Sequence, residues 1–324
     1  MQHILIIRPG AIGDALLTFP VIQALRTRHS APHVTFVSNP AVLPLALDAG
    51  LAEEVSDYGL ALWSELFSAA GIRTSALQGL LQHIDIAICW LSDPDGIVEQ
   101  NLQANGVKHI TIAPGRPPVD TEVHIVDYLA HTIWPDESSF LSNNDHAPIF
   151  PSYHRHLTHR IASDDSRGDA RRRPAHRIAI HPGSGGAYKC WPVSGFATVI
   201  TALWQRNIPI LLLAGPADSE RLTNLLQRLP TPGAPELLGI LQDAPLRTVA
   251  QELQQCRGYL GNDSGITHLA ALLDIPTIVL FGPSNPAIWH PYGGSIKVLY
   301  KPVLANLPPD TVLYTVEGFF YLAL

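Results

Sequence analysis

The five residues from Gly261 to Gly265, Gly-Asn-Asp-Ser-Gly, combine the residue types that bind an anion. They form a polar turn ahead of an apolar run over 266–273, which we expect to be a helix. Asp263 or Ser264 can cap this helix, and the first N–H groups of a helix lack partners within it and bind anions readily. The polar residues of its first turn, Thr267 and His268, are expected to reach the same anion. The segment predicts a site for a ligand that carries phosphate.

A second candidate segment is the loop His-Pro-Gly-Ser-Gly-Gly-Ala-Tyr-Lys-Cys-Trp-Pro, from His181 to Pro192. Its Gly and Ser residues can present backbone N–H groups from a flexible loop, and Lys189 supplies a cation. The pattern favours a cradle for a diphosphate, with a surface loop and a solvated lysine as the alternative. It is not a Walker A loop, because its spacing is wrong and Cys190 stands where Ser or Thr is required.

A third candidate is Arg-Pro-Gly-Ala-Ile-Gly-Asp, where a strand runs through a glycine-containing turn into a helix. Asp14 falls in the first helical turn, where the dipole favours a carboxylate. From spacing alone, Asp14 can equally be a helix cap or a group that faces a ligand. A dinucleotide-binding loop is not expected, because Gly10 and Gly13 do not fit G-x-G-x-x-G and the second strand ends without an acid.

Two more acids, Asp218 and Glu220, begin the helix after an apolar strand, where the helix dipole alone can explain them. No metal site is predicted, because the chain has no H-x-x-x-H, C-x-x-C or clustered carboxylate pattern. We expect Cys190 to be a packed thiol rather than a reactive one.

Around these segments, short apolar strands alternate with helical runs, which indicates parallel sheets covered on both faces. In the first half we expect strands at 4–7, 34–38, 84–90 and 109–112, and helices at 14–28, 60–70, 96–104 and 123–133. In the second half we expect strands at 178–181, 208–214, 258–260 and 277–281, and helices at 195–205, 218–228, 246–255 and 266–273.

These elements predict an α/β chain of two Rossmann-like domains, 1–150 and 178–305. A polar linker, rich in Arg and His, joins them over 151–177. It can touch an anionic membrane surface, but its acids favour a solvated linker. A tail over 306–324 contains two adjacent phenylalanines, so we expect it to pack back on the body.

Composition excludes several classes of protein. The net charge of −7 argues against nucleic-acid binding. Three widely spaced cysteines favour a reducing, cytoplasmic setting over a disulfide framework. No apolar run approaches the roughly 18 residues of a membrane helix.

Three segments resemble glycosyltransferase family 9, the family of the lipopolysaccharide heptosyltransferases. They are the opening at 4–22, the loop at 181–192, and the stretch at 263–271 with its continuation at 281–289. They occur in the family's order and span most of the chain. The resemblance implies a GT-B fold, in which two Rossmann-like domains with parallel sheets face an interdomain cleft.

The resemblance also implies an inverting, metal-independent glycosyltransferase with no cofactor besides its nucleotide-sugar co-substrate. Asp14 would be the general base for the acceptor hydroxyl, and Lys189 would stabilise the departing diphosphate. In the family an acid near Asp218 or Glu220 contacts the ribose, and the alignment does not choose between them. The other expected donor-binding residues are Gly13, Ser184, Gly185, Asp263, Ser264, Gly265 and His268.

The family's best-known donor is ADP-heptose, and its acceptor is the lipopolysaccharide inner core. We therefore expect a nucleotide-sugar donor and a glycan or lipid-linked acceptor as partners, no nucleic acid, and a cytoplasmic protein that contacts the inner membrane surface peripherally. Two alternatives stay open: a non-catalytic nucleotide-sugar-binding protein, against which the retention of Asp14 and Lys189 argues, and a GT-B enzyme with another donor and acceptor.

Overall fold

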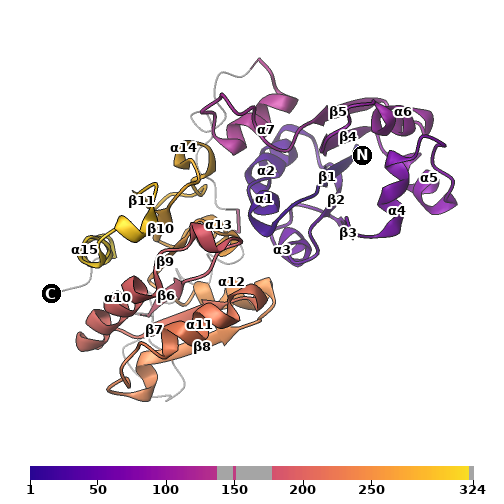
Figure 1. Ribbon diagram of the computed structural model, residues 1–324. Coiled ribbons are helices and arrows are strands. Elements are labelled where there is room, and N and C mark those ends of the chain that lie inside the picture. The colour runs from indigo at the N-terminus through magenta and orange to yellow at the C-terminus, as the bar shows by residue number, and fades with distance from the viewer. Residues whose placement is uncertain (137–148, 151–176, 321–324) are drawn as a thin grey trace. The chain divides into compact units, whose positions relative to one another are not determined.

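The computed structural model describes residues 1–136, 149–150 and 177–320. The chain divides into two compact units, Met1–Ile149 and Phe150–Leu324. Each unit is built from one sheet with helices around it (Figure 1). The predicted linker over 151–177 lies outside the described residues except for Arg177, and so do the last four residues of the tail.

The N-terminal unit holds a five-stranded parallel sheet in the order β3-β2-β1-β4-β5. Its strands are β1 His3–Arg8, β2 His33–Ser38, β3 Glu54–Asp57, β4 Ile86–Trp90 and β5 His109–Ala113. Its helices are α1 Ile12–Leu16, α2 Phe19–Arg28, α3 Leu43–Asp48, α4 Ala61–Ser64, α5 Ser75–Leu81, α6 Ile97–Ala104 and α7 Ile125–Ile133, with the 3-10 turn η1 Glu65–Phe67.

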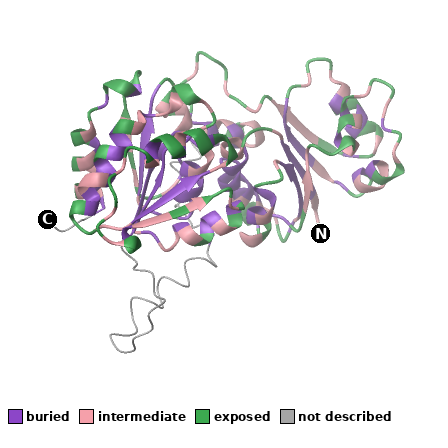
Figure 2. Cartoon of the chain, turned by 60° about the horizontal axis from the view of Figure 1, so that its bottom comes forward, coloured by how far each residue is buried: buried purple, intermediate pink, exposed green. Residues whose placement is uncertain are grey.

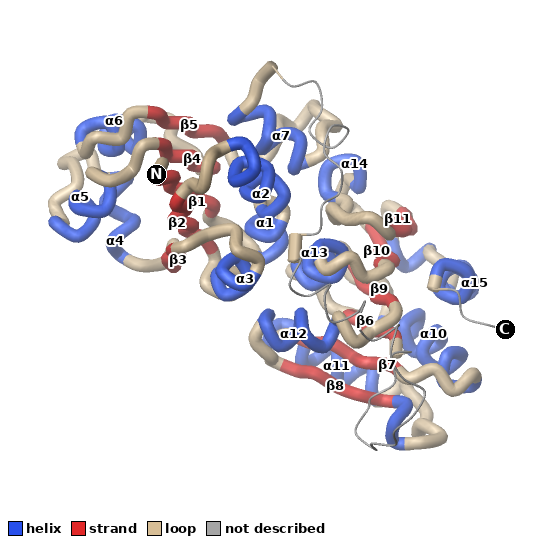
Figure 3. The backbone as a smooth tube through the Cα atoms, turned by 180° about the vertical axis from the view of Figure 1, so that it is seen from behind, coloured by secondary structure: helices blue, strands red, loops and turns tan. Residues whose placement is uncertain are grey.

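Helices cover both faces of this sheet (Figure 3). On one face, Leu5 and Ile7 of β1 pack with Trp63 of α4 and with apolar residues of α5 and α6. On the other face, Phe36 of β2 meets Phe19 of α2 edge to face, with 6.2 Å between ring centroids. Because the central strand is covered on both sides, it is apolar at every position from 4 to 7, and Figure 2 shows the sheet interior as buried.

The C-terminal unit holds a six-stranded parallel sheet in the order β11-β10-β9-β6-β7-β8. Its strands are β6 Ile178–His181, β7 Ile210–Ala214, β8 Leu238–Gln242, β9 Gly258–Asn262, β10 Thr277–Phe281 and β11 Ile296–Tyr300. Its helices are α10 Val193–Gln205, α11 Ser219–Leu226, α12 Leu246–Leu253, α13 Gly265–Leu272, α14 Pro286–Trp289 and α15 Pro309–Phe319. Its 3-10 turns are η2 Ala187–Lys189, η3 Pro216–Asp218, η4 Pro235–Leu237 and η5 Leu304–Asn306.

The described part of the tail belongs to the core of this unit. Helix α15 packs beside α10, and Val312, Val316 and Phe320 are buried in the same apolar cluster as the sheet. The Phe320 ring lies so close to the backbone of β9 that a Cβ added at Gly258 would stand 2.6 Å from it. The adjacent aromatics that made the tail apolar in sequence are therefore explained by packing within the unit.

The order of the strands determines where each unit can bind a ligand. In the N-terminal sheet the chain proceeds outward on one side from β1 and on the other side from β4, and in the C-terminal sheet it does so from β6 and β9. Open parallel sheets bind ligands at the carboxyl ends of such neighbouring strands, where the connections diverge. In this chain β1 leads to Asp14, β6 ends at His181, and β9 leads to Ser264.

Most predicted elements occur within two residues of their expected bounds, and the exceptions have physical causes. The single helix expected over 14–28 is wrong. Pro20 has no N–H to donate to the preceding turn, so the chain forms α1 and α2 with Pro20 in the first turn of α2. The helix expected over 60–70 is shorter, because α4 passes into η1, which ends at Phe67.

Three strands were not predicted, and each is a half-exposed edge strand without a continuous apolar run: β3, β8 and β11.

Candidate functional site

The N-terminus of α13 is the candidate anion-binding feature of the C-terminal unit. Ser264 is the N-cap, since its Oγ accepts a hydrogen bond from the N–H of Thr267. Among the described residues, the N–H groups of Gly265 and Ile266 have no acceptor. Two unpaired donors at the positive end of a helix bind an anion well. Of the two residues that could cap this helix, the structure selects Ser264.

Asp263 forms an ion pair instead. Its Oδ2 lies 2.9 Å from Nζ of Lys189, and its Oδ1 lies 3.8 Å from Nε2 of His268. The Asp263 side chain is only 7% exposed, whereas the Lys189 side chain is 30% exposed and so remains accessible to a ligand. The structure thus brings together three residues that the sequence predicted for one site. It also shows that the ammonium of Lys189 is shared with a carboxylate rather than free.

The loop that carries Lys189 is anchored at both ends by Asn262, the buried last residue of β9. Nδ2 of Asn262 donates to the carbonyl oxygens of Pro182 and Gly183, at 2.8 and 3.2 Å. Its Oδ1 accepts from the N–H of Trp191 at 2.9 Å. The amide of Asn262 therefore anchors the segments on either side of Lys189, and the flexibility expected of the Gly/Ser residues between them stays a prediction.

Ser184 and Gly185 occupy the middle of this loop. The Ser184 hydroxyl donates to the backbone carbonyl of Asp263 at 2.6 Å, so it joins the loop to the turn before α13. Gly185 is exposed, and a Cβ added there would meet nothing within 4 Å. Close packing requires a different glycine of the loop: a Cβ at Gly183 would lie 1.9 Å from Oδ1 of Asp218.

Asp218 is turned into the protein. Its Oδ2 accepts from Nε2 of His181 at 3.0 Å and from the N–H of Gly215 at 2.9 Å. Burial by itself would raise the pKa of this carboxyl, but the hydrogen bonds from His181 and Gly215 together with the nearby charges hold the pKa of Asp218 below its usual value. Glu220, in contrast, is exposed on the first turn of α11. Of the two acids considered for the ribose, Glu220 is the one whose carboxylate faces solvent, and its role stays a prediction.

In the N-terminal unit, Asp14 stands at the third position of α1. Its Oδ2 accepts from the N–H of Ala11 at 3.2 Å, and its Oδ1 lies 3.3 Å from Nη2 of Arg8. A second guanidinium, that of Arg116, approaches Oδ2 at 4.0 Å. Asp14 therefore helps to cap its helix, which is one of the two interpretations that spacing left open. Its carboxylate is 13% exposed, and its role toward a ligand stays a prediction.

The two glycines before Asp14, Gly10 and Gly13, are under different structural constraints. Gly10 has φ of 131°, and a Cβ there would lie 3.1 Å from the Asp14 carboxylate, so both backbone and space require it. Gly13 lies within α1, and its carbonyl accepts from the N–H of Leu17. Nothing in the geometry of Gly13 singles it out for the donor, so its donor-binding role stays a prediction.

Sequence reasoning missed three residues of these clusters: Arg8, His181 and Asn262. Each is the polar last residue of a strand whose preceding residues are apolar over at least two positions, a signal that could have found them. Arg8 is 4% exposed, and burial lowers the pKa of its guanidinium in spite of the charge of Asp14.

The expectation that Thr267 reaches an anion is wrong. Thr267 is fully buried, and its hydroxyl donates to the carbonyl of Asn262.

Other reactive groups give no second site. Burial raises the pKa of the Cys190 thiol, as expected for a packed cysteine. Among the described residues, no group of three or more His, Cys, Asp or Glu side chains could hold a metal ion.

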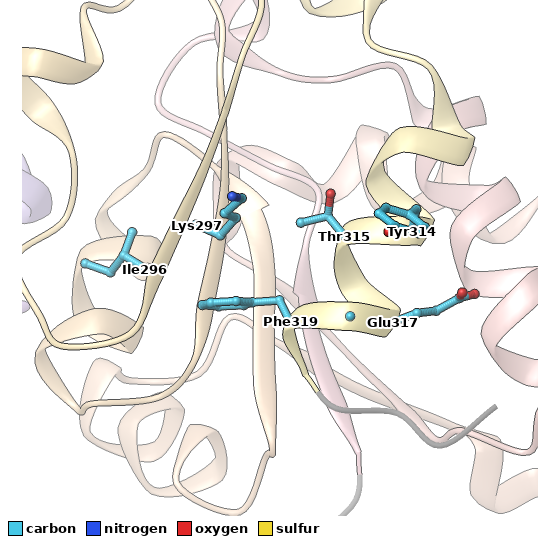
Figure 4. A pocket seen from close by; sticks show the side chains of 7 residues that line it. Ile296, Lys297, Tyr314, Thr315, Glu317 and Phe319 are labelled. Atoms are coloured by element: carbon cyan, nitrogen blue, oxygen red, sulfur yellow. The ribbon is translucent and has the colours of Figure 1, made fainter.

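A hollow of about 670 Å³ lies between β11 and α15, and none of the candidate site residues lines it (Figure 4). Its lining residues are Ile296, Lys297, Tyr314, Thr315, Glu317, Gly318 and Phe319. Within the described ranges, no helix combines the length and apolar character needed to cross a bilayer.

Comparison with solved structures confirms the fold class. The chain is similar to the Escherichia coli ADP-heptose lipopolysaccharide heptosyltransferase II, with a TM-score of 0.73, 18% identity and 99% of both chains covered. It is also similar to the E. coli heptosyltransferase WaaC solved with ADP, with a TM-score of 0.71, 20% identity, and 98% of this chain and 99% of that one covered. At such identities the likeness concerns the fold, which is the predicted GT-B class with two parallel-stranded α/β units.

Comparison of sequences identifies the family. Lipopolysaccharide heptosyltransferase 3 of E. coli is 29% identical over 121 residues, which are 37% of this chain and 35% of that protein. The chain thus matches about a third of the length of this curated relative. The family model described as glycosyltransferase family 9 (heptosyltransferase) matches residues 142–308, slightly more than half of the chain. The protein belongs to glycosyltransferase family 9.

Proposed function

We propose that this protein is an inverting glycosyltransferase that moves a sugar from a nucleotide diphosphate donor to a glycan acceptor. The observation that carries the proposal is the open N-terminus of α13 beside the Lys189–Asp263 pair, at the diverging strands β6 and β9. Helix donors and a partly exposed ammonium fit a diphosphate. The donor that the relatives' names favour is ADP-heptose, and the acceptor is a lipopolysaccharide core or a related lipid-linked glycan.

The proposed reaction is a single in-line displacement. Asp14 removes the proton from an acceptor hydroxyl, whose oxygen forms a bond to the anomeric carbon of the sugar. The bond between that carbon and the diphosphate oxygen breaks, and its electron pair stays with the diphosphate. Lys189 and the N–H groups of Gly265 and Ile266 stabilise the charge that grows there. One displacement inverts the configuration at the anomeric carbon.

The surroundings of Asp14 suit a general base that must be held in one position. Arg8 and the N–H of Ala11 fix the carboxylate in one orientation, which lowers the entropic cost of the proton transfer. No metal is required in this proposal, because Lys189 and the helix donors supply the positive field at the diphosphate.

A binding protein without catalysis is the second candidate, because the donor site alone does not demand turnover. The two are separated by calorimetric titration with ADP, GDP and UDP, followed by incubation with ADP-heptose and a delipidated inner-core acceptor. The proposal predicts binding that is tightest for ADP, and sugar transfer to the acceptor. Tight nucleotide binding without transfer to any core acceptor would favour the binding protein, and the absence of binding to all three nucleotides would contradict both.

A further inference from the structure

His181 joins three segments of the proposed donor site. It is the last residue of β6 and is 4% exposed. Its Nε2 lies 3.0 Å from Oδ2 of Asp218 in η3, and its Nδ1 lies 3.2 Å from Oγ of Ser264, the cap of α13. Because both ring nitrogens are engaged, any change in the protonation of His181 must change the partners of Ser264.

The hydrogen atoms of this network can be assigned by counting donors. An ionised carboxylate only accepts, so Nε2 of His181 carries a hydrogen and donates it to Asp218. The hydroxyl of Thr267 donates to the carbonyl oxygen of Asn262. The Tyr259 hydroxyl, 2.9 Å from Oγ1 of Thr267, must then be the donor of that pair.

Ser264 is the one member with two choices. Its Oγ accepts from the N–H of Thr267 in either case. With a neutral imidazole, the Ser264 hydroxyl donates to Nδ1 of His181. With a protonated imidazole, Nδ1 donates to Ser264, whose own hydrogen turns to Oγ1 of Thr267 at 3.1 Å. Every group is satisfied in both states, so protonation of this buried ring breaks no hydrogen bond.

The charges around His181 balance in the absence of ligand. The carboxylates of Asp218 and Asp263 face the cations of Lys189 and Arg221, the last of which also bonds to the carbonyl of Trp191. The other titratable groups nearby are Tyr259, Cys190 and His268; burial raises the pKa of both Tyr259 and Cys190, which keeps them neutral. A diphosphate at the N-terminus of α13 adds two negative charges to this balanced set, and at low local dielectric such charges attract a compensating proton.

We propose that His181 is the positioning residue of the diphosphate site and that it takes up a proton when the donor binds at the N-terminus of α13. The inference rests on the proposed function, since it needs a diphosphate ligand. The protonated ring adds a cation behind Ser264. The site's other cation, the ammonium of Lys189, is shared with Asp263. It also turns the contact with Asp218 into an ion pair and so locks η3 to the cap of α13.

The test is isothermal titration calorimetry at pH 7 in buffers of different ionisation enthalpy, which counts the protons exchanged on binding. The probe is ADP-2-deoxy-2-fluoro-heptose, because both of its phosphates are esterified and neither titrates near neutral pH. We expect the wild type to take up a measurable fraction of a proton per bound ligand at pH 7. Its affinity for the probe should rise as the pH falls from 8 to 6.

Three variants identify the group that takes up the proton. His181→Gln keeps an N–H donor for Asp218 but does not titrate, so uptake should vanish while binding persists. Asp218→Asn leaves the ring in place but removes the charge that stabilises its protonated form, so uptake should fall sharply even if His181→Gln does not fold. His268→Gln is expected to bind the probe more weakly, because His268 belongs to the expected donor site, but it should keep the uptake per bound ligand.

Two results would overturn the inference while leaving the proposed function intact: probe binding by the wild type without proton uptake, or uptake that survives in His181→Gln and disappears in His268→Gln. If neither ADP nor the probe binds the wild type, the proposed function itself fails and this inference fails with it.

Discussion

Three of the acids singled out in this chain are each paired with a basic side chain at close range. Asp14 pairs with Arg8, Asp263 with Lys189, and Asp218 with His181. A carboxylate removed from water is costly unless it is paired and hydrogen-bonded, so partners of this kind are expected wherever an acid lies in a folded site. The sequence motifs predicted these acids and Lys189, but not Arg8 and His181, which are the last residues of strands β1 and β6.

The shared ammonium of Lys189 leads to a prediction about charge. Lys189→Ala removes a cation and leaves the buried carboxylate of Asp263 beside the incoming diphosphate. We expect kcat/KM to fall by roughly 10²–10³-fold, as for loss of one strong donor to developing charge. The double variant Lys189→Ala/Asp263→Asn should recover part of the lost donor affinity, because the repulsive charge is gone.

Lys297→Ala, on the exposed edge strand β11, is the matched control and should behave as wild type. Equal donor affinities for the single and double variants would show that Asp263 does not oppose the phosphates.

The lowered pKa of Asp218 predicts that the free energy of unfolding depends on pH. Its pKa is lower in the folded protein than in the unfolded chain, so the unfolded chain binds a proton more readily as the pH falls. The stabilisation by Asp218 is thus complete above the unfolded pKa and is lost as the pH falls through the folded value. Thermal unfolding from pH 7 down to pH 3 should show that Asp218→Asn is less stable than wild type at pH 7 and approaches it toward pH 3. A constant difference across this range would contradict an ionised Asp218 carboxylate that accepts hydrogen bonds from His181 and Gly215.

At the scale of elements, the sequence predicted the buried parallel strands and the helices beside them, because continuous apolar runs bounded by Gly and Pro have few other solutions. Edge strands such as β8 and β11 escaped prediction, since none of their residues is fully buried and their apolar runs are interrupted by Gly239 and Lys297. The anion site at α13 was predictable because its cap, glycine and strand are contiguous. The His181 network was not, because Asp218 and Ser264 lie 37 and 83 residues away and only the strand order brings them together.

The contact between α15 and β9 gives a prediction about packing. Gly258→Ala would place a methyl group 2.6 Å from the Phe320 ring, so we expect a loss of about 1–3 kcal/mol in the free energy of unfolding. Phe320→Ala should cost about 3–5 kcal/mol through the cavity it leaves. In the double variant the methyl group finds room, so the combined loss should be smaller than the sum of the single losses. Strict additivity in denaturant unfolding would show that the two residues do not meet.

At the scale of the whole molecule, the proposed reaction divides its groups between two units. Asp14 belongs to the unit Met1–Ile149, and Lys189 and the α13 donors belong to the unit Phe150–Leu324. Both clusters lie at the carboxyl ends of the strands from which their sheets diverge, which is where open α/β sheets bind ligands.

Metal independence is a prediction for the complete enzyme. Lys189 and the N–H groups at α13 are proposed to supply the positive field at the diphosphate, so transfer should continue in excess EDTA at a rate within about twofold of the untreated enzyme. Added Mg²⁺ or Mn²⁺ should not raise that rate. Loss of transfer in EDTA that is restored by one particular metal ion would show that the leaving diphosphate needs a cation that these residues do not provide.

The most direct test of the proposed function is acceptor-dependent turnover of ADP-heptose by wild type and Asp14→Asn, with donor affinity measured on the same preparations. The amide keeps the shape of Asp14 but cannot accept the acceptor proton, so transfer should fall by roughly 10²–10⁴-fold. The dissociation constant for ADP-heptose should stay within a few-fold of wild type, and the wild-type product should carry the inverted anomeric configuration by NMR. Normal transfer by Asp14→Asn, or a product that retains the donor's configuration, would contradict the account.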